Sequence, residues 1–188
     1  MPWQRHDGRP HRAALPARWS FLCLLALLTA SAWGAEQVYQ RPEDFVREAF
    51  DGEPPPAKVL WLTGERKKAV TRILGHPPPR LRLRYWLRGA RSVWILEEIG
   101  KERPITVGVV VEDGRIRRLK VLIFRESRGY EVRHDFFTRQ FEGATLRGDA
   151  RLDRRIDGIS GATLSVRAVT KLARLALWLD QEVRRGAP

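Results

Sequence analysis

Cysteine is almost absent from this chain. The single one, Cys23, lies within the first 34 residues, and the remaining 154 residues contain none. In the chain that remains after removal of residues 1–34, disulfides, thiolate catalysis and cysteine-ligated metal or iron–sulfur sites are excluded. His76 and His134 stand alone, with no second ligand at metal-binding spacing, so we predict no metal site. Any redox chemistry would therefore come from a bound cofactor.

Long apolar runs are also scarce. The apolar stretch over residues 21–28 is shorter than the ~20 residues that a membrane-spanning helix needs. A basic segment precedes it and small residues follow it, which predicts a Sec-type signal peptide over residues 1–34, cleaved after Gly34. An uncleaved anchor is the alternative. The residues that carry this pattern are Arg5, Arg9, Arg12, Arg18, Ala32 and Gly34.

Acidic residues are too few to balance the basic ones. The chain holds 35 Lys and Arg against 22 Asp and Glu, a net charge of +13. Residues 1–34 carry four Arg and one Asp, so the other 154 residues keep +10. Such a basic domain can bind nucleic acid, an anionic membrane surface or an acidic protein. Export argues against nucleic acid and favours a membrane surface or a redox partner in the periplasm.

The order of the expected elements predicts an α+β fold, an antiparallel sheet with helices packed on it. The length after residue 34 suits one domain. We divide the chain into the signal peptide (1–34), N-terminal helices and first strands (35–103) and a core (104–185). Hydrophobic periodicity and turn residues predict helices over 42–50, 65–74 and 163–184, a short helix or turn over 135–141, strands over 81–88 and 92–97, and a hairpin of 105–111 with 116–124 around Asp113-Gly114.

The most informative segment is Asp157-Gly-Ile-Ser-Gly-Ala-Thr-Leu-Ser165, where a loop meets the longest expected helix. A helix start offers unpaired N–H groups and a positive dipole end, which suit a phosphate. Gly161 permits a close backbone approach, and Ser160 and Thr163 flank it with hydroxyls. The simpler alternative is that Ser160 or Thr163 only caps the helix. For Asp157, a plain Asx-turn and a role in holding the loop remain open.

Two upstream segments accompany this one. Residues 126–131 read Glu-Ser-Arg-Gly-Tyr-Glu, and residues 137–143 read Phe-Thr-Arg-Gln-Phe-Glu-Gly. Gly129 would allow a ligand to approach the backbone, and Tyr130 could stack on a ring or pack as an ordinary aromatic. We expect Phe137 and Phe141 to pack in the core.

Together these three segments resemble signatures of the FMN-binding domain family: D-G-x-S-G-A-T, E-T/S-x-G and F-x-x-Q-F-x-G. Members include the C subunit of the sodium-translocating NADH:quinone reductase and the G subunit of the Rnf electron-transport complex. In that family a flavin transferase joins the last Thr to FMN through a phosphoester outside the cytoplasm. The resemblance covers residues 105–183 and makes Thr163 the attachment residue.

The resemblance also implies which residues surround the cofactor. Backbone N–H groups of Gly161, Ala162 and Leu164 would bind the phosphate, and residues 126–131 would form a wall for the ring. Asp157 would hold the loop or help the transferase to recognise it. The expected cofactor-binding residues are Thr163, Ser160, Gly161, Ala162, Leu164, Asp157, Glu126, Ser127, Gly129 and Tyr130; no catalytic residue is assigned.

These observations predict an exported, periplasmic flavoprotein that carries covalent FMN on Thr163 and transfers electrons between a membrane or periplasmic donor and an acceptor. Its partners would be the flavin transferase and a redox protein or complex. Whether it has a substrate of its own, as a reductase component would, is open. The alternative is a basic periplasmic binding or scaffold domain with an unloaded flavin site.

Overall fold

A six-stranded antiparallel sheet forms the centre of the fold in the computed structural model, which describes residues 36–186. The strands lie in the order β1-β6-β5-β4-β3-β2, so β5 and β4 hold the two central positions, and β5 pairs with β6 as the predicted hairpin. The predicted signal peptide lies outside the described residues. The strands are β1 (Gln37–Val38), β2 (Lys58–Trp61), β3 (Arg82–Arg88), β4 (Arg91–Ile99), β5 (Pro104–Glu112) and β6 (Arg115–Phe124).

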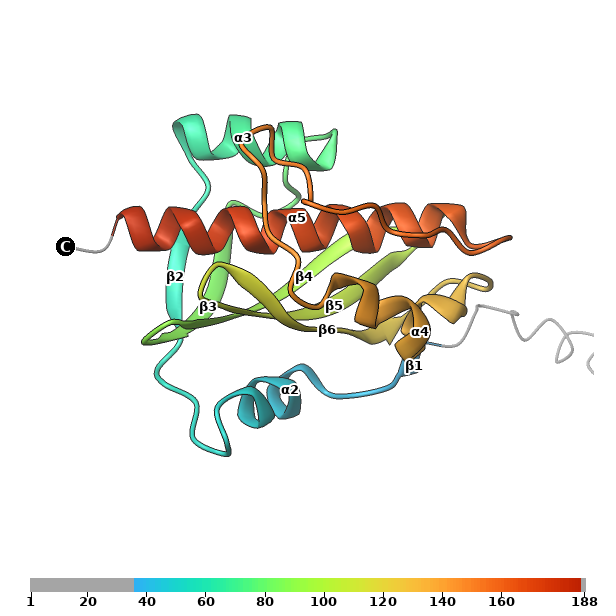
Figure 1. The fold of residues 1–188 in the computed structure, drawn as a ribbon, viewed down its shortest axis with the longest axis horizontal. Coiled ribbons are helices and arrows are strands. Elements are labelled where there is room, and N and C mark those ends of the chain that lie inside the picture. Colours follow the sequence, from blue (N-terminus) through green and yellow to red (C-terminus); the bar gives the residue numbers. More distant parts are fainter. Residues whose placement is uncertain (1–35, 187–188) are drawn as a thin grey trace, which may run out of the picture. The chain divides into compact units, whose positions relative to one another are not determined.

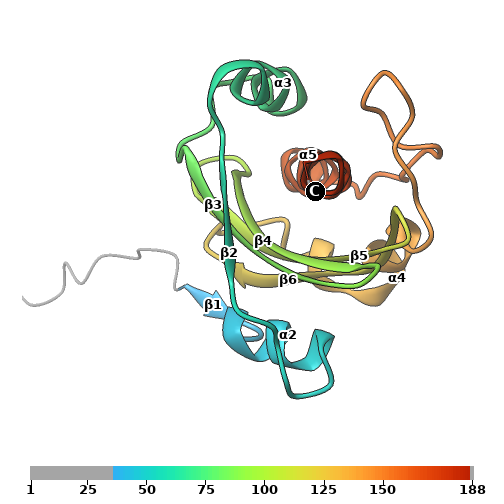
Figure 2. The same cartoon turned by 90° about the vertical axis from the view of Figure 1, so that its left-hand side faces the viewer.

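Helices cover both faces of this sheet. Figures 1 and 2 show α3 and α5 on one face and α2 on the other. This arrangement confirms the predicted α+β class. None of the helices within residues 36–186 has the length and hydropathy of a membrane-spanning segment. The helices are α2 (Pro42–Ala49), α3 (Gly64–Leu74), α4 (Asp135–Thr138), α5 (Thr163–Arg185), and the 3-10 turns η1 (Tyr130–Arg133) and η2 (Arg139–Phe141).

Strand β5 shows why the sheet needs helices on both sides. Its residues Ile105 to Val111 are all buried, which is the pattern of a strand covered on both faces. Val109 packs in the core beneath α3 and α5, whereas Val110 packs in the smaller core beneath α2. Gly108 leaves room for Phe45 of α2, because a Cβ there would lie 2.5 Å from the Phe45 ring.

Helix α5 confirms the predicted C-terminal helix, ending one residue later than expected. Its apolar face lies on the sheet, as its periodicity requires. One charged residue is buried with it: Asp180 accepts a hydrogen bond from the Ser92 hydroxyl at 2.6 Å. The Trp94 indole donates to the same hydroxyl at 2.9 Å, so a polar chain ties α5 to β4.

Sequence reasoning missed the two outermost strands, β1 and β2. Each is short, and each pairs with residues far along the chain: Gln37 lies opposite Phe124, and Leu60 opposite Leu83. Such edge strands carry little hydrophobic periodicity of their own, and long-range pairing decides whether they form. Residues 143–156 are irregular apart from one bridge between Leu146 and Leu152.

Candidate functional site

A tight turn leads into helix α5. The Ala162 amide donates to the Ile159 carbonyl at 3.0 Å, and Gly161 takes a φ of +80° at the third position. This is the conformation of a type II turn, which requires glycine or asparagine at that position. A Cβ on Gly161 would meet no atom within 4 Å, so the space above the turn is open.

The start of α5 leaves its hydroxyls unused. The helix begins at Thr163 with Ala162 as N-cap, and no side chain caps it. The simple capping alternative is therefore not what the structure shows. Within residues 36–186, the exposed hydroxyls of Ser160 and Thr163 make no hydrogen bond. The Thr163 hydroxyl oxygen is thus unbonded and lies at the positive end of a 23-residue helix.

One of the backbone amides expected to bind the phosphate is not available. The Ala162 amide is engaged by Ile159. The first intrahelical bond runs from the Val166 amide to the Ala162 carbonyl at 2.9 Å. The amides of Thr163, Leu164 and Ser165 therefore form the unpaired first turn and are available to an anion, whereas the Ala162 amide is not.

The loop of residues 126–131 packs against this helix start. Gly129 is buried at a φ of +85°, and a Cβ on it would lie 2.5 Å from the Ser165 Oγ and 3.5 Å from the Ala162 Cβ. Glycine is required here both for its backbone angle and for the close approach. Residues 126–131 and 157–165, which each resemble a signature of the same family, thus lie next to each other in the fold.

We expect Gly129→Ala to destabilise the fold by about 3 kcal/mol, since a left-handed backbone with a Cβ and an overpacked contact each cost about 1–2 kcal/mol. Gly114→Ala is the matched control, because Gly114 also has a positive φ (+71°) but a Cβ there meets nothing within 4 Å. Urea unfolding followed by tryptophan fluorescence measures both. An equal decrease in the free energy of unfolding in the two variants would show that residue 129 does not pack against α5.

The third segment holds the turn from the other side. The Gln140 side-chain carbonyl accepts a hydrogen bond from the Asp157 amide at 2.7 Å. Phe137 and Phe141 are fully buried and pack edge to face at 5.4 Å, as the expected core role requires. Asp157 is exposed, and its carboxylate accepts no hydrogen bond within the described residues, so an Asx-turn does not form.

Glu126 holds a neighbouring turn. Its buried Oε1 accepts hydrogen bonds from three consecutive amides, those of Lys101, Glu102 and Arg103, at 2.5, 2.7 and 3.0 Å. This oxygen is therefore committed to the β4–β5 turn, and we assign Glu126 to positioning the 126–131 loop. Arg125 is similarly occupied: its Nη1 donates to the Thr106 hydroxyl at 2.9 Å.

The outer surface of the site is partly apolar. Tyr130 is 44% exposed and Leu164, next to Thr163, is 43% exposed. The Arg133 guanidinium lies over the Tyr130 ring, 5.7 Å from its centroid, which restricts the ring. Ser127 is also exposed. Exposed aromatic and aliphatic side chains beside the unpaired amides of a helix start suit a cofactor with a phosphate at one end and a flat ring at the other.

Sequence reasoning did not foresee a polar cluster two turns further along α5. The buried Glu98 carboxylate contacts His76 Nε2 at 3.0 Å and Lys171 Nζ at 3.2 Å. The hydrogen bond to Glu98 raises the pKa of His76, and a second one to the Pro77 carbonyl adds to the effect. Across residues 36–186, no group of three or more His, Cys, Asp or Glu is placed to hold a metal ion.

Comparison with known proteins gives one family match for this chain. Residues 100–178 match the family model of the FMN-binding domain, which supports membership of that family. The match spans all three signature segments and supports FMN as the cofactor. No curated protein and no solved structure matches the chain.

Proposed function

We propose that this protein is an exported flavoprotein that carries FMN in a phosphoester bond on Thr163 and transfers electrons between a membrane or periplasmic donor and an acceptor. The observation that supports it best is the Thr163 hydroxyl, exposed and without a hydrogen bond, at the unpaired amides of the first turn of α5. The FMN-binding domain around it supports the cofactor.

The residues present fit such a cofactor. Gly161 keeps the space above the turn open, and the amides of Thr163, Leu164 and Ser165 would hold the phosphate. Tyr130 and Leu164 would contact the ring. FMN supplies the electron-accepting chemistry, which protein side chains cannot. The chain would hold it in place, and a covalent bond would retain it where free flavin is scarce.

The charge and the leading segment support the rest of the proposal. The predicted signal peptide would deliver the chain to the periplasm, where a flavin transferase would load it. The net charge of +10 outside residues 1–34 suits an acidic redox partner or an anionic membrane face.

Intact mass measurement on the purified periplasmic protein tests this function. Co-expression with a flavin transferase should add the mass of one FMN less one water, and the band should fluoresce in a denaturing gel. Expression without the transferase is the control and should give the unmodified mass. An unmodified mass after verified export with an active transferase would contradict the proposal and favour a binding or scaffold domain with an unloaded site.

A further inference from the structure

A concave site lies far from Thr163, on the outer side of α5. It is a pocket of about 510 Å³ between α3, α5 and residues 146–150. This volume lies in the range of small-molecule sites, roughly 300–1,000 Å³. Trp178 is fifteen residues beyond Thr163, about 22 Å along the helix axis at 1.5 Å per residue. The pocket is therefore separate from the first turn of α5.

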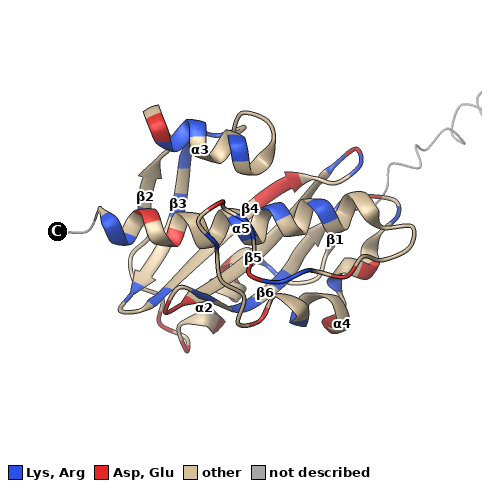
Figure 3. Ribbon diagram, turned by 45° about the horizontal axis from the view of Figure 1, so that its top comes forward, with Lys and Arg blue, Asp and Glu red and all other residues tan. Residues whose placement is uncertain are grey.

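The pocket is basic. Four arginines line it, Arg72, Arg147, Arg174 and Arg185, against one acidic residue, Asp149. The Asp149 carboxylate is engaged by Arg151, whose Nε lies 3.3 Å away. Figure 3 shows the basic residues recurring along α3 and α5. Arg185 pairs with Glu182 at 3.1 Å, so the unpaired positive charge of the lining lies on Arg72, Arg147 and Arg174, where an anion would neutralise it.

Arg174 is oriented by the protein itself. Its Nε donates to the Ala150 carbonyl at 2.6 Å, and within the described residues its other nitrogens have no partner. Ala150 has a φ of +58°, a strained angle for alanine that is retained where the surroundings demand it. Burial lowers the pKa of Arg174, and nearby Arg151 adds to this, so the charged form is held at a cost that a bound anion would relieve.

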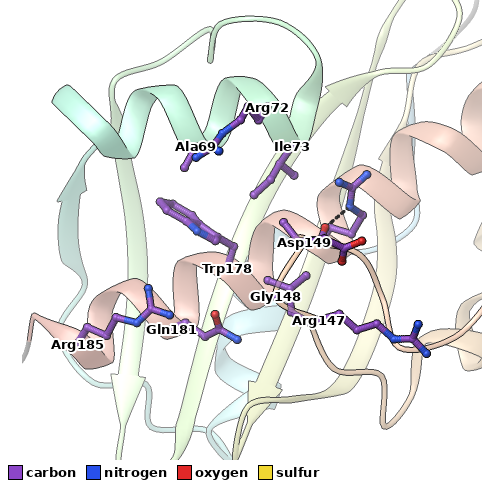
Figure 4. A pocket seen from close by; sticks show the side chains of 12 residues that line it. Ala69, Arg72, Ile73, Arg147, Gly148, Asp149, Trp178, Gln181 and Arg185 are labelled. Atoms are coloured by element: carbon purple, nitrogen blue, oxygen red, sulfur yellow. Dashed lines mark hydrogen bonds between the residues drawn. The ribbon is translucent and has the colours of Figure 1, made fainter.

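Trp178 gives the pocket a flat apolar wall. Its half-buried ring packs on the core and also lines the cavity. In Figure 4 the Trp178 side chain faces Ala69, Arg72 and Ile73 of α3 across the opening. Arg174 and Arg185 lie one and two turns from Trp178 on the same side of α5, because residues spaced by three or four share a face.

From these observations we infer that the pocket between α3, α5 and residues 146–150 binds a flat organic anion with two acidic groups. The ring would lie on Trp178, one acidic group would meet the open edge of the Arg174 guanidinium, and the other would meet Arg72 across the cavity. Arg72 makes no ion pair or hydrogen bond within the described residues, so it is available to a ligand. The inference does not depend on a loaded flavin.

Calorimetric titration of the full chain with naphthalene-2,6-dicarboxylate tests this site. We expect saturable binding to one site, and no binding of the uncharged diamide. Arg174→Gln and Arg72→Gln should each weaken binding about tenfold or more, because each removes a charge-assisted contact. Arg82→Gln is the matched control: Arg82 lies exposed on β3, outside the pocket, and has no partner within the described residues.

The variants also separate specific from general attraction. A change in affinity below about twofold in Arg82→Gln would support the assignment. An equal loss of affinity in all three variants would show attraction to net charge alone and would overturn it. Absence of saturable binding to the wild-type chain would also overturn it. Arg72 contributes no internal contact, so a folding defect in Arg174→Gln would leave Arg72→Gln as the deciding variant. Flavin loading is measured separately by mass, so either proposal can fail without the other.

Discussion

Replacing Thr163 by valine is expected to abolish the gain of one FMN less one water while the protein remains folded. Valine keeps the β-branched shape but has no oxygen to form the ester. The Thr163 side chain is exposed and its hydroxyl makes no hydrogen bond within the described residues, so its loss should change the free energy of unfolding by no more than about 0.5 kcal/mol. Intact mass and thermal unfolding measure the two effects.

Ser160 provides the control for this prediction. It lies in the same turn, is also exposed and likewise makes no hydrogen bond within the described residues. Ser160→Ala should therefore keep the added mass, and Thr163→Ser, which restores a hydroxyl, should keep at least part of it. A mass gain that persists in Thr163→Val, or that disappears only in Ser160→Ala, would place the attachment elsewhere.

The second large effect concerns the buried carboxylate of Asp180. Asp180 is 1% exposed, and Arg184 Nε lies 3.0 Å from both of its oxygens. Arg184 also donates to the carbonyls of Gly89 and Ala90 at 3.2 and 2.5 Å. Arg184→Met would leave a buried charge with only the Ser92 hydroxyl as donor. We expect the free energy of unfolding to fall by about 3 kcal/mol. This is the lower end of the range for a broken buried ion pair, because Arg184 is one-third exposed.

Urea unfolding followed by tryptophan fluorescence measures this loss. Arg185→Met is the matched control: its guanidinium pairs with Glu182 at 3.1 Å on the surface, where such pairs contribute about 0.2–1 kcal/mol. The double variant Asp180→Asn with Arg184→Met should be more stable than Arg184→Met alone, since it removes the unpaired charge. If Arg184→Met costs no more than Arg185→Met, the carboxylate does not depend on Arg184.

The local elements of this fold could be predicted because their signals are local. Pro42 at a helix start, Gly75 at a helix end and the Asp113-Gly114 turn each act within a few residues. The apolar periodicity of α5 was sufficient to predict its start at Thr163. The edge strands β1 and β2 were missed because their formation depends on pairing with β6 and β3.

The roles of individual site residues were less predictable. Glu126 was expected at a ring wall, but its Oε1 is bonded to the amides of residues 101–103. Gln140, which was given no role of its own, accepts a hydrogen bond from the Asp157 amide. These pairs are separated by more than fifteen residues, so no spacing rule connects them. The pocket around Trp178 and Arg174 likewise forms only where α3, α5 and residues 146–150 come together.

The sequence by itself determined the α+β class, the absence of cysteine chemistry after residue 34, the excess of positive charge and the segments that resemble FMN-binding domains. These properties follow from composition, short-range periodicity and local motifs. Only the tertiary structure decided that Gly129 meets Ser165, that Thr163 is free of a capping role and that Asp180 is paired inside the core. Those outcomes depend on contacts between distant residues, whose geometry is set by the packing of helices on the sheet.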